Sequence, residues 1–117
     1  MIAPTAADPL LQIDIACPDT RTLVEHVTSK WGVLVLLTLR EQTLRWSELK
    51  RAIPGVSEKM LIQTLQTLEA DGLVRRVALP VVPPHVEYSL SATGEDASRL
   101  LAPLVSWAQQ QVGRPGT

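Results

Sequence analysis

The order of helix starts and breaks between residues 46 and 72 constrains the fold more than any other feature of the sequence. Ser47 has the position and chemistry to cap a short helix over residues 48–53, which Pro54 and Gly55 end sharply. Ser57 then begins a longer helix with one narrow apolar stripe, made by leucines at spacings of four and three: Leu61, Leu65 and Leu68. A short capped helix, a tight turn containing glycine and a longer helix with an apolar inner stripe are the parts of a helix-turn-helix.

Two segments typical of strands follow Gly72, which ends the longer helix. Residues 73–79 are rich in β-branched side chains, residues 86–90 alternate in strand fashion, and a proline-rich stretch separates them. The pair predicts a hairpin, or wing. Pro83 and Pro84 would stiffen its loop, or would stop this edge from pairing with other strands, and both can hold.

Two helices are predicted before the helix-turn-helix. Asp19 or Thr20 can cap a helix that runs to about Thr28. Ser29 can cap a second one over residues 31–39, which is apolar nearly all round, as expected of a buried central helix.

A last helix, capped by Thr93 and kinked at Pro103, follows the hairpin and ends near Val112. The predicted fold class is mainly α with a β-hairpin wing, a winged helix-turn-helix. The predicted organisation is an N-terminal arm over residues 1–16 with a short extended piece, the domain over 17–112, and a flexible tail over 113–117.

Composition fits one globular domain: 117 residues, of which 45% are hydrophobic and 20% charged. The net charge of −1 hides an asymmetry, since residues 40–76 carry seven basic and five acidic side chains and the remainder sums to −3. The longest apolar run is well short of the roughly 20 residues of a membrane span. The first residues lack the basic and apolar regions of a secretory signal, so we expect a cytoplasmic protein.

The sequence contains no recognisable catalytic or metal-binding motif. Glycines are scattered through turns and termini and form no phosphate-cradling loop. Cys17 and His26 could be taken as nucleophile and base, but a histidine on a short helix is far more often solvated or satisfied. One cysteine and two separated histidines do not make a four-ligand zinc site, and no cofactor is expected.

The longer helix has the chemistry of a helix that reads DNA. Its outer face carries Lys59, Gln63, Gln66 and Thr67, and a glutamine can pair bidentately with adenine. The first-turn amides, with Ser57, can hold a phosphate. The bland alternative is a solvated helix face, and the basic wing that follows shifts the balance towards double-stranded DNA.

The chain resembles the HxlR-type regulators, a MarR-like winged-helix family, from Cys17 to about Val112. The most specific matching segments are KW at 30–31, WSEL at 46–49, PGVSEKML at 54–61, VPP at 82–84 and YSL at 88–90. The resemblance implies transcription factors that bind pseudo-palindromic operators as dimers, with subunits joined through the first and last helices. The predicted DNA-contacting residues are Ser47, Ser57, Glu58, Lys59, Met60, Gln63, Thr64, Gln66, Thr67, Arg75, Arg76 and His85.

The sequence departs from the family where arginines are common, with Thr64 and Gln66 on the reading helix and His85 on the wing. Fewer phosphate contacts predict weaker binding, a flatter salt dependence and a pH response through His85. A winged-helix module that binds protein and has lost its DNA affinity is the competing hypothesis.

Cys17 precedes a helix amino-terminus, which can lower the pKa of a thiol. Members of the family with a cysteine here include sensors of oxidants or electrophiles, so the resemblance suggests a redox switch. The alternative is a small buried residue of structural importance only.

The apolar face of the last helix is wider than one contact needs. We assign the surplus to a second subunit; the alternative is that the first helix of the same chain covers it. The predicted dimer interface consists of Leu23, Val27, Leu100, Leu104, Trp107 and Ala108. Trp31 and Trp46 are predicted core anchors, and either could line an effector pocket whose ligand the sequence does not specify.

Overall fold

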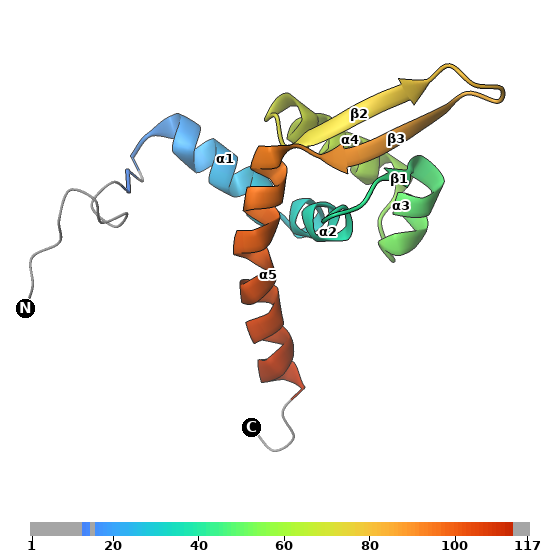
Figure 1. Ribbon diagram of the computed structural model, residues 1–117. Coiled ribbons are helices and arrows are strands. Elements are labelled where there is room, and N and C mark those ends of the chain that lie inside the picture. The colour runs from blue at the N-terminus through green and yellow to red at the C-terminus, as the bar shows by residue number, and fades with distance from the viewer. Residues whose placement is uncertain (1–12, 15, 114–117) are drawn as a thin grey trace, which may run out of the picture.

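The computed structural model describes residues 13–14 and 16–113, with five helices and three strands in these ranges (Figure 1). The helices are α1 (Pro18–Thr28), α2 (Lys30–Thr38), α3 (Trp46–Ala52), α4 (Glu58–Ala70) and α5 (Ala92–Val112). The strands are β1 (Leu44–Arg45), β2 (Val74–Leu79) and β3 (His85–Leu90). The predicted order of four helices, a hairpin and a last helix is confirmed. Nearly all of the predicted arm and tail lies outside the described residues.

Two of the predicted helix caps are confirmed. Ser29 Oγ accepts a hydrogen bond from the Gly32 N–H at 3.1 Å, and Ser57 Oγ accepts one from the Met60 N–H at 3.1 Å. Each hydroxyl satisfies one of the amide groups that the first turn of a helix leaves without a partner. These two serines therefore fix where the central helix α2 and the helix α4 begin.

The predicted caps of α1 and α3 are wrong. α1 begins two or three residues earlier than a cap at Asp19 or Thr20 would allow, because Pro18 fits the first helical position and Cys17 takes the cap position. α3 begins at Trp46, so Ser47 lies inside its first turn. The capping contact there runs from the Arg45 N–H to Glu48 Oε1, at 2.9 Å.

The third wrong cap is at α5, which begins at Ala92 with Ser91 as its cap. Ser91 Oγ accepts from the Gly94 N–H at 3.0 Å and donates to the Gly72 carbonyl at 2.6 Å. It therefore ties the start of α5 to the end of α4, a long-range contact that no local pattern predicts. α5 continues through Pro103 as one uninterrupted helix.

We expect Ser91→Ala to lower the free energy of unfolding by about 1–2 kcal/mol, since it removes a cap and a bond to the Gly72 carbonyl. Thr93→Ala, at an exposed position inside the first turn, should change it by less than about 0.5 kcal/mol. Urea unfolding of both variants measures the difference. Equal losses of unfolding free energy in the two variants would contradict the assignment of Ser91 as the cap of α5.

The sheet has one strand more than the predicted hairpin. Its order is β1-β3-β2, all antiparallel, and β1 pairs Leu44 with Tyr88 and Arg45 with Glu87. A strand of two residues carries no alternation that could be recognised in the sequence. β1 links the helix-turn-helix to the wing, so the two are parts of one body.

The core surrounds α2, as predicted, and Val35, Leu36 and Leu39 are fully buried there. α4 and α5 both pack against α2. Trp31 and Trp46 lie partly buried at the edge of this core, which agrees with their predicted role as anchors. In the described part of the chain, no helix is both long and apolar enough to cross a membrane.

Candidate nucleic-acid interface

The turn between α3 and α4 aims the second helix outwards. Gly55 has a φ of +85°, a conformation that side-chain-bearing residues rarely adopt, and Ile53 and Val56 anchor the turn in the core. The predicted leucine stripe of α4 is buried. The opposite face of the same helix is therefore left open to a ligand.

The exposed face of α4 brings together four of the predicted contact residues. Glu58, Lys59, Gln63 and Gln66 are all exposed, and they line one shallow surface with Ile62. Ile62 is 46% exposed. Sequence reasoning missed it because an apolar residue on a helix is usually assigned to the core, although its position outside the leucine stripe was a usable signal.

Three further predicted contacts lie towards α1. Met60, Thr64 and Thr67 line a groove that Glu25 and His26 close on the other side. Thr64 and Thr67 are half-buried. Thr64 Oγ1 also donates to the Met60 carbonyl at 2.7 Å, which occupies its only proton within the helix. These residues thus flank the exposed face and do not form its centre.

Ser47 and Ser57 stand at the first turns of the two helices. Both residues are exposed. Ser57 Oγ already accepts from Met60, so its remaining hydrogen-bonding capacity is its own proton and a second lone pair. A phosphate at this helix start would be held by free amides and that hydroxyl together.

The wing carries its arginines near its base. Arg75 and Arg76 are exposed and pair in register with Ser89 and Tyr88. Because neighbouring strand residues face opposite ways, Arg76 lies on the side of α4 and Arg75 on the far side.

The tip of the wing, residues 80–84, is apolar, and Val82 is 99% exposed. His85 is half-buried, and its Nε2 is buried without a hydrogen-bond partner among the described residues. In this conformation, Nε2 is not presented to a phosphate. The exposed cationic side chains of the wing, Arg75 and Arg76, are thus confined to its base.

Cys17 is partly exposed at the start of α1. Thr20, through its backbone N–H and then its hydroxyl, and Asp19, through its backbone N–H, lower the pKa of the Cys17 thiol below its ordinary value. Donors aimed at the sulfur stabilise the thiolate, which is the nucleophilic form. The predicted effect of the helix start on this thiol therefore has a specific structural cause.

The last helix leaves much of its apolar face uncovered within one chain. Leu100, Leu104 and Trp107 are 79%, 56% and 58% exposed. The first helix does not cover them, and its own Leu23 and Val24 are exposed as well. The alternative of intrachain cover is therefore wrong. Ala108 is exposed beside this strip.

Val27 is the member of the predicted interface that the structure places differently. It is half-buried and packs against the core of its own subunit. Val24, one turn earlier on the same helix, is the more exposed residue. The available apolar surface of α1 therefore centres on Leu23 and Val24.

His26 joins α1 to the end of α4. Its Nδ1 lies 2.7 Å from Asp71 Oδ2, and both side chains are largely shielded from solvent. The histidine is thus a satisfied structural residue, as its position suggested. Among the described residues, no group of three or more histidine, cysteine, aspartate or glutamate side chains is placed to hold a metal ion.

Residues 26–115 match the HxlR-like helix-turn-helix family. YtfH of Escherichia coli (strain K12), an HTH-type transcriptional regulator that is itself uncharacterised, is 58% identical over 93 residues, 80% of this chain and 73% of YtfH. The solved structure of ytfH from Salmonella typhimurium is 54% identical with a TM-score of 0.76, covering 82% of this chain and 85% of that one.

Diamide-treated YodB from Bacillus subtilis is also similar, with 29% identity and a TM-score of 0.70 over 83% of this chain and 96% of that one. The family match spans the helix-turn-helix, the wing and α5. Its members are regulators of transcription and not enzymes. The chain belongs to the HxlR-like helix-turn-helix family of DNA-binding transcriptional regulators.

Proposed function

We propose that the protein binds a specific double-stranded operator as a homodimer. The observation that carries this proposal is the outer face of α4, where Lys59, Ile62, Gln63 and Gln66 are exposed together, with Arg76 of the wing beside Ile62 and Gln66. A helix with this face fits the major groove, and the wing then reaches the adjacent backbone. We expect the protein to act where the operator lies, in the cytoplasm.

Each exposed group on α4 has a base or phosphate that suits it. Gln63 would pair bidentately with an adenine, and Lys59 would reach a guanine or a phosphate. Ile62 would contact a thymine methyl group. Base readout would thus come from the middle of the face, and positioning from the helix start and the wing base.

A second subunit would cover the apolar strip of α5. Leu100, Leu104 and Trp107 form this strip, and Leu23 and Val24 of α1 would extend it. A chain of this size gains substantially from burial in a partner, and a two-fold dimer reads a pseudo-palindrome. In this assignment, residues 17–112 act as the functional domain.

The test is binding of the purified protein to the DNA upstream of its own gene, against a shuffled duplex, across a salt series. Lys59, Arg75 and Arg76 from two subunits would neutralise about six phosphates, so log affinity should fall with log salt with a slope of about −5. Gln63→Ala should weaken binding to the operator by roughly tenfold to a hundredfold, and to the shuffled duplex much less.

Gln109→Ala, which removes an exposed glutamine on the opposite side of α5 from the apolar strip, is the matched control and should bind as the wild type does. A slope near −10 would contradict the predicted small number of phosphate contacts. Equal and negligible binding to both duplexes at low salt would favour the protein-interaction module instead.

We further propose that oxidation or alkylation of Cys17 releases the operator. The lowered pKa of the thiol supports this, as does the similarity to YodB, whose structure was solved after diamide treatment. Diamide takes two electrons and two protons from two thiols. Since each chain has one cysteine, the disulfide would join two subunits or Cys17 and a small thiol.

Thr20→Val should raise the pKa of Cys17 because it removes the hydroxyl that donates to the sulfur. Alkylation by iodoacetamide near pH 7 should then slow by about twofold or more. Thr22→Val, at an exposed position on the same helix, should leave the rate unchanged. An ordinary alkylation rate in the wild type, with DNA affinity insensitive to diamide, would reject the redox switch.

A further inference from the structure

Lys30 is a cation that the predicted DNA contacts do not include. It is the first residue of α2, directly after the Ser29 cap, and it is exposed. Its Nζ lies 4.5 Å from the centroid of the Trp31 ring. Because the face of an indole ring attracts a cation, the ammonium group has a preferred position on the surface of the molecule.

The Trp31 ring places this ammonium group beside the turn of the helix-turn-helix. Trp31 packs against the core, and its Cη2 would lie 3.9 Å from a Cβ added at Gly55. Gly55 belongs to the turn between α3 and α4. The ring therefore connects the start of α2 with the segment that leads into α4, and the charge of Lys30 lies on that ring.

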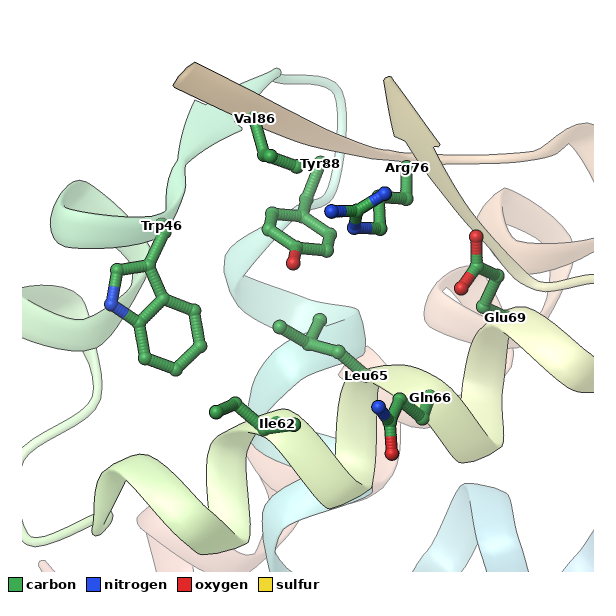
Figure 2. Close-up of a pocket in the computed structure, with 8 residues that line it drawn as sticks. All are labelled: Trp46, Ile62, Leu65, Gln66, Glu69, Arg76, Val86 and Tyr88. Atoms are coloured by element: carbon green, nitrogen blue, oxygen red, sulfur yellow. The ribbon is translucent and has the colours of Figure 1, made fainter. Parts of the chain in front are cut away.

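Two grooves run along opposite flanks of α4. On the wing side, Arg76 shares a groove with four residues of the helix (Figure 2): Ile62, Leu65, Gln66 and Glu69. On the α1 side, Ser29 shares a second groove with four others: Met60, Gln63, Thr64 and Thr67. Helical periodicity puts these two sets on opposite sides of α4. The exposed face of α4 thus lies between Arg76 on one flank and the start of α2, with Lys30, on the other.

The positive charge of Lys30 is available to a ligand. In the described part of the chain, the ion pairs join His26 to Asp71 and Arg99 to Asp96, so Lys30 has no acidic partner there. The dipole of a helix favours negative charge at its start, where this lysine lies. An anion bound beside Lys30 would therefore interact favourably with the ammonium group and with the first turn of α2.

We propose that Lys30 binds a backbone phosphate on the DNA strand that borders the major groove on the α1 side. The inference rests on the proposed function, which places α4 in that groove. A major groove is bounded by two strands, so Arg76 reaches the backbone on one side and Lys30 the backbone on the other. Trp31 is a positioning residue, since a side chain that is already held in place loses less entropy on binding.

The test compares Lys30→Gln with the wild type on the operator and the shuffled duplex, across the salt series. One further phosphate in each subunit raises the total from about six to about eight, which gives the wild type a slope of about −7. Lys30→Gln should return the slope to about −5 and weaken binding near 0.1 M salt by roughly tenfold to a hundredfold. Both duplexes should lose affinity equally, because a phosphate contact carries no sequence information.

Two variants control for charge and for folding. Arg40→Gln removes a positive charge from the other end of α2, where Arg40 is exposed beside α5, and should bind as the wild type does. Lys30→Arg keeps the charge and should keep the slope of the wild type. Circular dichroism checks that all three variants keep the fold. An unchanged slope in Lys30→Gln, or an equal change in Arg40→Gln, would overturn the proposal.

Neutral methylphosphonate linkages, placed one at a time along each operator strand, locate the phosphate. The linkage that Lys30 contacts should weaken binding of the wild type and have little further effect in Lys30→Gln. We expect that linkage on the opposite strand of the major groove from the one that shows this pattern with Arg76→Gln. If both variants point to the same linkage, the two side chains do not flank α4 on the DNA and the proposal fails.

The result for Lys30 is distinct from the result for the proposed function. If Gln63→Ala loses affinity selectively for the operator while Lys30→Gln keeps the affinity and slope of the wild type, the proposed function stands and the Lys30 contact is rejected. If the wild type binds neither duplex at low salt, both are rejected.

Discussion

Trp107→Glu is expected to abolish the proposed dimer and to lower operator affinity by roughly 10²–10⁴-fold. Trp107 is a large aromatic residue that one chain leaves 58% exposed, about one turn after Leu104 on the same strip of α5. In a symmetric dimer, one substitution places two carboxylates in the interface, and burying an unpaired charge is very costly. Each half-site would then be bound independently.

Sedimentation equilibrium and operator binding measure the two parts of this result. Ser106→Glu is the matched control, since Ser106 is exposed on another side of α5 and receives the same charge. It should remain dimeric. If both variants are monomeric, added charge anywhere on α5 disrupts the dimer and the result does not identify the apolar strip as the interface. If both variants are dimeric, the subunits contact each other through another surface.

The largest loss of stability is expected from Gly94→Ala. Gly94 is buried in the first turn of α5, and a Cβ there would overlap the carbonyl oxygen of Leu73 and lie 3.2 Å from Leu90 Cβ. The obstacle is backbone, and that backbone is fixed by the bond from the Ser91 N–H to the same Leu73 carbonyl, at 2.9 Å. We expect a loss of about 3 kcal/mol.

Thermal unfolding should show this as a fall in Tm of roughly 12–24 °C. Gly72→Ala provides the comparison, because Gly72 has a φ of +79° but nothing within 4 Å of an added Cβ. Its cost should be only about 1 kcal/mol, from left-handed backbone. A larger loss of stability in Gly72→Ala than in Gly94→Ala would mean that the left-handed backbone at Gly72 requires glycine more strongly than the close backbone contact at Gly94 does.

The architecture could be predicted because its signals are local. The spacing of Leu61, Leu65 and Leu68 identifies the buried side of α4, and Gly72 identifies its end. Errors arose where a contact comes from elsewhere in the chain. Ser91 caps α5 while bonded to Gly72, and β1 exists only because β3 lies beside it.

The sequence predicted which types of residue the candidate site contains better than it predicted how they are arranged. The exposed positions of Lys59, Gln63 and Gln66 follow directly from helical periodicity. The placement of Thr64 and Thr67 against α1 depends on tertiary packing. So does the inward position of Arg76, since strand alternation alone does not say which face meets α4.

The helix α1 has no buried residue, and its side chains join α4 through the contact between His26 and Asp71. An element held so lightly can detach at a free energy far below that of global unfolding. The fold therefore combines a helix-turn-helix packed on the core with a first helix that is held by fewer buried contacts. In the proposed dimer, detachment of α1 would change how the two subunits are arranged, while the helix-turn-helix of each subunit stayed folded.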